Sequence, residues 1–303
     1  LALFPDFFQA TYPGRIGTAR SQLRVLPVPF LPLCAGYKTA LVKTAFKSSD
    51  KRKSEMSTSK VILVTGGSSG IGFAIASRFV QEGLQTIITG RNEEKLKAAA
   101  CQLGPLCKGI AFDMDWLDRI PEFINSIVQE YSHIDVLVNN AGINQKKPFL
   151  EVTNEDFDRI VKTNQTALFA MTREVARVMV DQVQKGTIVH ISSMSAHYGI
   201  PQVTAYSASK TAVEGMTRSM AVDLSPMGIR VNCVAPGFIS TPMSAKAFNS
   251  DPARKEKVLS RTPIGHLGTT EDVANAVYFL ASEDAKFITG EVLKVDGGNS
   301  IGF

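Results

Sequence analysis

The chain has 303 residues, a length that fits one large domain or two small ones. It is 44% hydrophobic and 20% charged, which excludes collagen-like and wholly disordered chains and leaves ample residues for a core. The formal net charge of +5 makes a nucleic acid or a membrane surface the first partners to consider.

The positive charge is confined to the N-terminal segment. Residues 1–55 hold nine of the 33 basic residues and three of the 28 acidic ones, so they carry +6 and the rest of the chain carries −1. No basic stripe interleaved with aromatic residues follows, which argues against a nucleic-acid partner. The apolar run 25–37 is too short and too interrupted by proline to span a bilayer, so we expect no membrane partner.

Residues 1–55 are expected to be an extension, disordered or foreign to the natural protein, and residues 56–303 a single domain. The first methionine, Met56, stands directly before the first strand pattern. The extension fits three hypotheses: an acid-poor presequence for an organelle, a membrane-surface arm using Lys51, Arg52 and Lys53, or upstream sequence preceding a natural start at Met56. We therefore expect a cytoplasmic protein, or an organellar one if residues 1–55 are a targeting segment.

Cysteine and histidine spacing predicts no metal site. The four cysteines form no Cys-x-x-Cys pair, and the four histidines are dispersed along the chain. Scattered cysteines in a chain of this length are typical of reduced thiols in a cytosol-like compartment.

From residue 60 onward, strand and helix patterns alternate. Short β-branched runs predict strands at 60–65, 85–90, 109–112, 134–139, 187–192, 230–235 and 292–295. Helical patterns follow the first strand to about residue 82 and recur near 92–103, 119–131, 154–184, 204–225 and 271–281. Capping boxes are predicted at Thr153 with Asp156 and at Thr269 with Asp272. The alternation predicts an α/β fold, a doubly wound parallel sheet of the Rossmann type, with a helical substrate lid over 242–262.

A glycine-rich turn joins the first strand to the first helix. Its spacing is Gly-x-x-x-Gly-x-Gly, and its place between strand and helix is the context that a dinucleotide requires. Glycine lets the backbone approach a pyrophosphate, and the helix N-terminus supplies N–H groups and a positive dipole. The predicted cofactor-binding residues here are Thr65, Gly66, Ser68, Ser69, Gly70, Ile71 and Gly72.

The end of the second strand favours NADP (NADPH) over NAD. NAD sites place an acid there to hold the ribose 2′-hydroxyl, whereas NADP sites lack it and offer a cation. Here the strand ends Thr89-Gly90-Arg91-Asn92, and the Arg91 guanidinium suits a 2′-phosphate. The alternative is that Arg91 is a solvated loop cation.

Four further residues stand out by their type and position: a tyrosine, a lysine, a serine and an asparagine. Tyr206 and Lys210 stand four residues apart, on one face of a predicted helix. Ser193 follows a predicted strand, and Asn164 lies within a long predicted helix. A lysine ammonium and an oxidised nicotinamide would both favour the phenolate of the tyrosine, as a base near neutral pH requires.

Together these motifs resemble the short-chain dehydrogenase/reductase family over essentially all of residues 60–303. Besides the glycine-rich turn, the resemblance includes Asp113, Asn139-Asn140-Ala141-Gly142, Asn164, Ser193, Tyr206 with Lys210, and Pro236-Gly237 followed by Ile239 and Thr241. The resemblance implies a carbonyl/alcohol oxidoreductase acting on CH–OH groups.

The resemblance also implies a role for each residue. Tyr206 would be the general acid/base, Lys210 would lower its pKa and hold the nicotinamide ribose, Ser193 would bind the substrate oxygen, and Asn164 would anchor a relay water. On the cofactor, Asp113 would face the adenine and Asn140 the adenosine ribose or nearby backbone. The remaining cofactor positions are Ala141, Gly142, Pro236 and Gly237, with Ile239 and Thr241 at the carboxamide.

The substrate stays open at this point. The 3-oxoacyl-carrier-protein reductases of the family are similar, but they tend to present arginines where this chain has Glu151 and Val222. Five polar residues flank the predicted site and favour a sugar, polyol or small ketone: Gln145, Lys146, Lys147, His197 and Gln202. The alternative for Lys146 and Lys147 is that they are a solvated pair on an exposed loop. A different class of function is a catalytically idle dinucleotide-binding regulator or scaffold. The resemblance implies a homotetramer or homodimer.

Overall fold

The computed structural model describes residues 60–182, 186–241 and 252–302. The expected N-terminal extension, residues 1–55, lies outside the described residues. So does the first half of the expected lid, residues 242–251. No helix among the described residues is long and apolar enough to cross a membrane.

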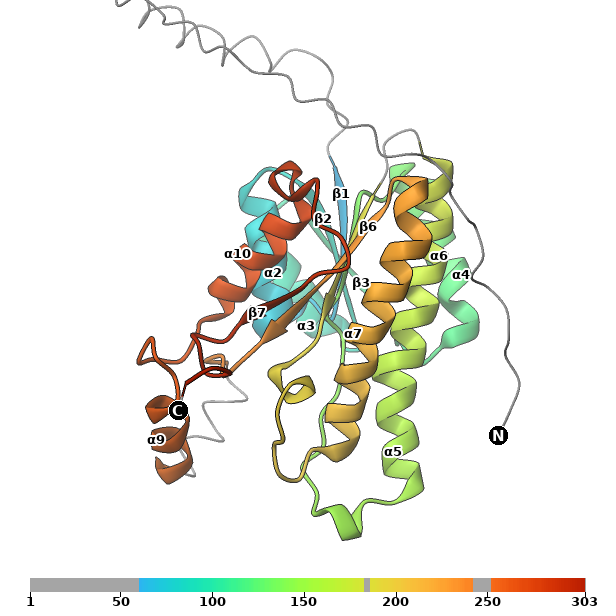
Figure 1. Ribbon diagram of the computed structural model, residues 1–303. Coiled ribbons are helices and arrows are strands. Elements are labelled where there is room, and N and C mark those ends of the chain that lie inside the picture. Colours follow the sequence, from blue (N-terminus) through green and yellow to red (C-terminus); the bar gives the residue numbers. More distant parts are fainter. Residues whose placement is uncertain (1–59, 183–185, 242–251, 303) are drawn as a thin grey trace, which may run out of the picture. The chain divides into compact units, whose positions relative to one another are not determined.

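A parallel sheet forms the centre of the domain (Figure 1). Its order is β3-β2-β1-β4-β5-β6-β7, so the chain leaves β1 toward one edge and returns to pair β4 with the other side of β1. The fold prediction is therefore confirmed. The strands are β1 (Val61–Thr65), β2 (Gln85–Gly90), β3 (Cys107–Ala111), β4 (Val136–Asn139), β5 (Thr187–Ile191), β6 (Arg230–Pro236) and β7 (Val292–Val295).

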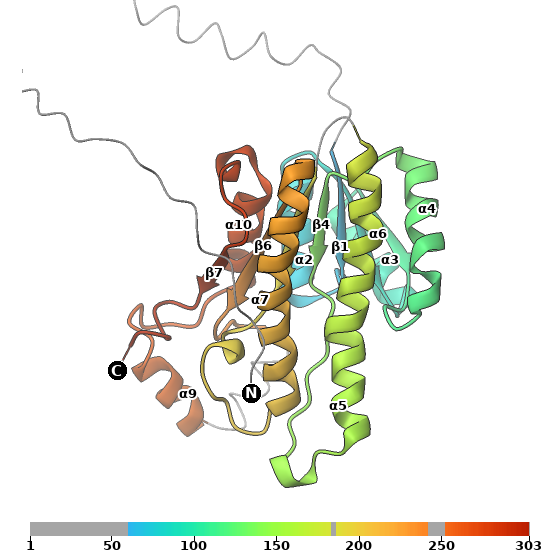
Figure 2. The same cartoon turned by 45° about the vertical axis from the view of Figure 1, so that its right-hand side comes forward.

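Helices cover both faces of this sheet (Figures 1 and 2). One buried cluster joins the sheet to α4, α6 and α7, and a second joins its other face to α2, α3 and α10. Both clusters consist of aliphatic and aromatic side chains, because a strand that is covered on both faces buries every residue. The described helices are α2 (Gly70–Gln81), α3 (Glu93–Leu103), α4 (Ile120–Tyr131), α5 (Asn154–Val161), α6 (Ala167–Asp181), α7 (Thr204–Leu224), α9 (Pro252–Ser260) and α10 (Thr270–Ala281).

Local signals in the sequence place the helix starts. Thr153 and Thr269 form the expected capping boxes with Asp156 and Asp272, and each threonine side chain accepts a hydrogen bond from the backbone of its aspartate. These boxes satisfy N–H groups that have no partner within the helix.

The prediction of one helix over 154–184 needs a correction. A π-helical segment, Lys162–Thr166, separates α5 from α6, and α6 ends at Asp181. The segment adds a residue to the turn and rotates Asn164 into a buried position, where only 1% of it is exposed. Helical periodicity cannot reveal such an insertion, because the apolar pattern resumes after it with a small change of phase.

Candidate active site

The predicted site residues gather at the carboxyl ends of the strands. Thr65 ends β1, Asn139 ends β4, Pro236 ends β6, and Ser193 follows β5 by two residues. Because all of these strands run parallel, their ends meet along the same edge of the sheet. Tertiary structure therefore unites motifs that stand far apart in the sequence.

The turn from β1 to α2 is shaped for an anion. Gly66 and Gly70 have positive φ angles of 68° and 58°, which favour glycine. A side chain at Gly72 would collide with the carbonyl oxygen of Gly66 and with the amide nitrogen of Asn140. Ser69, at the N-cap of α2, makes no side-chain capping bond, and the first turn holds no acid. The N–H groups and the dipole of α2 therefore remain available to a pyrophosphate, which fits a dinucleotide. The other residues predicted here, Ser68 and Ile71, lie half-buried on the same turn.

Thr65 connects this turn to the Asn-Asn-Ala-Gly segment after β4. Its hydroxyl oxygen accepts hydrogen bonds of 3.0 Å from the backbone N–H groups of both Asn140 and Ala141. The Asn140 amide donates to the carbonyl oxygens of Thr65 and Gly66, each at 3.0 Å. The side chain of Asn140 thus holds the backbone of the turn, which is a structural task beside the ribose contact that the resemblance implies.

The adenine side of the expected cofactor site lies beyond β2 and β3. Arg91 is exposed, and its side chain forms no ion pair or hydrogen bond with any residue that the structure describes. The neighbouring Asn92 caps α3 by accepting a hydrogen bond from the backbone of Lys95. Asp113 is half-buried, and one of its oxygens accepts a hydrogen bond of 3.0 Å from the backbone of Asp115. Arg91 is therefore free to contact a ligand.

Helix α7 brings Tyr206 to Ser193. The Tyr206 hydroxyl lies near the Ser193 side chain, which acts on the pKa of the tyrosine, and Ser193 accepts a 3.2 Å bond from the backbone of Ser195. Burial raises the pKa of Tyr206, and the hydrogen bond with Ser193 lowers it without outweighing that effect. Lys210 is not among the causes of this pKa shift, and its expected effect on the pKa of Tyr206 stays a prediction.

Lys210 lies beneath the tyrosine, with its ammonium nitrogen 5.7 Å from the centre of the Tyr206 ring. It donates a 2.7 Å hydrogen bond to the carbonyl oxygen of Ile191. Lys210 is only 4% exposed, and this burial lowers its pKa to about 8 because the charged form loses hydration. The lysine is thus held in place and is able to change its charge in the mildly alkaline range.

Asn164 packs against the loop that carries Gly142. Its side-chain oxygen accepts from the backbone of Ile143 at 2.8 Å, and its amide donates to the carbonyl of Ile143 and to the hydroxyl of Ser209. A side chain at Gly142 would crowd the Asn164 oxygen. The Asn164 side chain is therefore occupied by protein groups. The expectation that Asn164 anchors a relay water stays a prediction.

The predicted carboxamide side follows β6. Pro236 is buried, and the N–H of Gly237 bonds to the carbonyl of Val295 on β7 at 2.9 Å. Ile239 is buried and forms a β-bridge with Gly268. Thr241 is the last described residue before residue 252, and α9 lies within the range 242–262 that is expected to form a lid.

The polar residues that suggested a sugar or polyol are mostly occupied by other protein groups. Gln145 and Lys147 each bond to one oxygen of Asp156, both at 2.7 Å. His197 pairs with Glu214 at 3.0 Å. Lys146 and Gln202 remain exposed. The sequence identified Asp156 only as a capping residue and gave no role to Glu214, because contacts across loops leave no local pattern.

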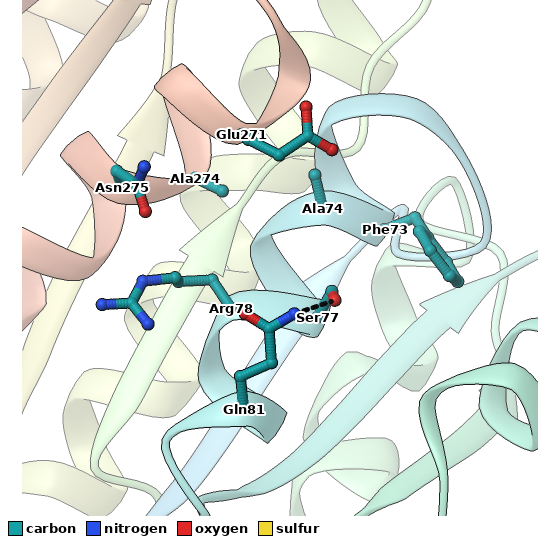
Figure 3. A pocket seen from close by; sticks show the side chains of 8 residues that line it. All are labelled: Phe73, Ala74, Ser77, Arg78, Gln81, Glu271, Ala274 and Asn275. Atoms are coloured by element: carbon teal, nitrogen blue, oxygen red, sulfur yellow. Dashed lines mark hydrogen bonds between the residues drawn. The ribbon is translucent and has the colours of Figure 1, made fainter.

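One surface hollow lies apart from these residues. It is an open depression between α2 and α10, and it holds no residue of the predicted site (Figure 3). Its lining consists of Phe73, Ala74, Ser77, Arg78, Gln81, Glu271, Ala274 and Asn275.

Comparison with known proteins agrees with this geometry. Residues 66–300 match the family model described as "Enoyl-(Acyl carrier protein) reductase". The chain is 41% identical over 242 residues to the 3-oxoacyl-[acyl-carrier-protein] reductase FabG of Thermotoga maritima, covering 79% of this chain and 97% of that protein. It is 39% identical over 247 residues to a 3alpha-hydroxysteroid dehydrogenase of Mediterraneibacter gnavus, covering 80% of this chain and 97% of that protein.

Solved structures give the same family. The structure described as ElxO with NADP bound has a TM-score of 0.75 and 36% identity, covering 80% of this chain and 98% of that one. A short-chain type dehydrogenase/reductase from Mycobacterium ulcerans has a TM-score of 0.76 and 31% identity, covering 80% and 90%. With the motifs and the fold, these matches show that the chain is an oxidoreductase of the short-chain dehydrogenase/reductase family.

Proposed function

We propose that this protein is an NADPH-dependent carbonyl reductase, which also oxidises the corresponding alcohol. The observation that carries the proposal is the juxtaposition of Ser193 and Tyr206 with the buried Lys210, at the same sheet edge as the glycine-rich turn. Bound NADPH would supply the hydride, and the protein would supply position and protons.

Ser193, Tyr206 and Lys210 each have a separate role in the reduction. Ser193 donates a hydrogen bond to the substrate carbonyl oxygen, where negative charge develops during reduction. Tyr206 donates the proton that this oxygen finally takes. A raised pKa suits this role, because the phenol is then protonated at neutral pH. Lys210, with a pKa of about 8, holds a proton that can replace the one Tyr206 gives up.

Arg91 supports NADPH as the cofactor. It stands exposed and unpaired at the end of β2, among the residues that the structure describes, and a guanidinium matches a 2′-phosphate. The solved relative at 36% identity is described with NADP bound. Arg91→Asp should raise the KM for NADPH by about tenfold or more while changing the KM for NADH little, since one charge-assisted contact is lost.

The matched control for this test is Lys95→Asp, on the exposed first turn of α3, which changes the charge equally. Equal changes of the two KM values in Arg91→Asp would refute the assignment.

For the substrate, a 3-oxoacyl thioester is the first candidate. Several relatives carry the name 3-oxoacyl-[acyl-carrier-protein] reductase. Glu151 and Val222 are both exposed where those enzymes tend to present arginines, which argues against a carrier-bound thioester and for a free one. A sugar or polyol is the second candidate. Of the five flanking residues, only Lys146 and Gln202 are exposed without a side-chain contact to another described residue, so only they favour it.

A substrate panel tests the proposal. The purified protein would be given NADPH with acetoacetyl-coenzyme A, a carrier-bound 3-oxoacyl chain, a ketose acid and a steroid ketone, and NADPH oxidation would be followed. Tyr206→Phe should lower turnover by about 10²–10⁴-fold. Tyr278→Phe, on α10, is the control for loss of a phenol elsewhere.

Two outcomes would contradict the proposal. Turnover by Tyr206→Phe near the wild-type rate would overturn the assigned mechanism. NADPH binding without turnover of any substrate would favour the idle regulator. We also propose a homotetramer or homodimer, and the molar mass by light scattering tests it.

A further inference from the structure

The buried carboxylate of Glu214 contacts both ends of the loop that contains Ser193. The Glu214 oxygen Oε1 accepts a 2.8 Å hydrogen bond from the hydroxyl of Ser192 and lies 3.0 Å from Nε2 of His197. Both donors therefore meet the same atom, although they are five positions apart in the chain. Figure 2 shows the segment between them as a yellow loop beside α7.

This loop holds the residue that is proposed to bind the substrate oxygen. Ser193 directly follows Ser192, and a short 3-10 turn, Met194–Ala196, leads to His197. The Ser192 hydroxyl also lies 3.2 Å from the carbonyl oxygen of Lys210. Glu214 stands one turn after Lys210 on α7. The contacts thus fix the loop to the helix that carries Tyr206 and Lys210.

Keeping an acid in this position has a cost. Glu214 is 6% exposed, and a buried carboxylate is less favourable than an apolar side chain unless donors compensate it. Ser192 and His197 are those donors. The His197 side chain is 24% exposed, so the contact between His197 and Glu214 borders on solvent. Such a group is better suited to specify a geometry than to add stability.

We propose that Glu214 is a positioning residue that sets the distance between Ser193 and Tyr206. It does so by accepting hydrogen bonds at both ends of the 192–197 loop. The inference rests on the proposed carbonyl reduction. A misplaced donor lowers the rate, because transition-state stabilisation depends on alignment with the developing charge.

The test compares Glu214→Ala with Glu214→Gln. Glutamine keeps an Oε1 acceptor for both donors, whereas alanine removes it. Glu214→Ala should lower kcat about 10- to 100-fold, because a misplacement of about 1 Å can cost up to about 10²-fold. Its dissociation constant for NADPH should stay within about twofold, because no cofactor contact changes. Glu214→Gln should retain kcat within about threefold, since it keeps both hydrogen bonds.

Asp223→Ala is the matched control, because Asp223 is an exposed acid on the same helix. A second variant, His197→Ala, removes only the partly exposed contact between His197 and Glu214. It keeps the buried hydrogen bond from Ser192 to Glu214. It should lower kcat less than Glu214→Ala does. His197→Ala keeps the proposal testable if Glu214→Ala folds poorly.

Hydrogen exchange of the 192–197 amides gives a readout that needs no substrate. Exchange should speed up in Glu214→Ala and in His197→Ala, and it should match the wild type in Glu214→Gln. This measurement separates the two proposals. Absent turnover in the wild-type protein would refute the proposed carbonyl reduction. Unchanged exchange in Glu214→Ala would refute the proposal that Glu214 holds both ends of the 192–197 loop.

Other outcomes also overturn the inference. If Glu214→Gln loses as much activity as Glu214→Ala, charge rather than hydrogen bonding at both ends of the loop is what matters. If kcat in Glu214→Ala and His197→Ala equals that of Asp223→Ala, the network has no part in positioning Ser193.

Discussion

Replacing Thr65 by valine removes a hydroxyl and leaves the shape of the side chain nearly unchanged. That hydroxyl accepts hydrogen bonds from the backbone N–H groups of Asn140 and Ala141, each at 3.0 Å, and it donates a longer one, of 3.3 Å, to Val138. Thr65 itself is fully buried, so water cannot replace the hydroxyl without rearrangement. The substitution therefore leaves the N–H group of Ala141 without an acceptor, whereas the N–H of Asn140 still reaches the carbonyl oxygen of Val138 at 3.1 Å.

The expected loss of stability follows from the N–H group of Ala141. An unsatisfied buried donor costs about 1–3 kcal/mol. Ala141 is half-buried, which puts its N–H toward the lower end of that range. Thr65→Val should thus lower the free energy of unfolding by about 1–2 kcal/mol. NADPH binding should weaken as well, because Asn140 also holds the backbone of the glycine-rich turn.

Thr89 offers a matched control in the neighbouring strand. It pairs with Thr65 in the β1–β2 register and is also fully buried, but its hydroxyl has no hydrogen-bond partner within the described part of the chain. Thr89→Val should therefore be neutral or stabilising. The assay is urea unfolding of both variants and of Thr65→Ser, which keeps the hydroxyl. Equal stability of Thr65→Val and Thr89→Val would refute the reasoning.

Two further predictions concern pH. Burial lowers the pKa of Lys210 to about 8. The value of kcat/KM for reduction should therefore be constant below that pH and fall above it, because the ammonium loses its proton. A profile that stays constant to pH ~10, the ordinary lysine range, would contradict this role. Burial lowers the pKa of His190 to about 3, so between pH ~6.5 and pH ~3 the unfolded chain binds a proton that the folded protein excludes. Stability should fall with decreasing pH in that window, and His190→Asn should lose about 2 kcal/mol less between pH ~6.5 and pH ~5 than the wild type loses, as measured by urea unfolding. Parallel pH dependences of the two proteins would show that His190 does not titrate as described.

Local patterns in the sequence determined much of this protein. The alternation of β-branched runs with helical stretches predicts the doubly wound sheet, since each pattern reflects burial within a few residues. The capping boxes at Thr153 and Thr269 are confirmed for the same reason: their partners stand three residues away. Tyr206 and Lys210 share a helix face because four residues make about one turn.

Only the tertiary structure decided which polar groups remain available to a ligand. In the sequence, Lys147 and His197 are both candidate substrate contacts. In the structure, Lys147 bonds to Asp156 and His197 contacts Glu214. Ser192 and Glu214 stand 22 residues apart, and their hydrogen bond exists because β5 and α7 pack together. Likewise, Asn164 turns inward through one extra residue in a helical turn. Such contacts depend on how the elements pack, and packing joins residues whose separation in the chain carries no periodic signal.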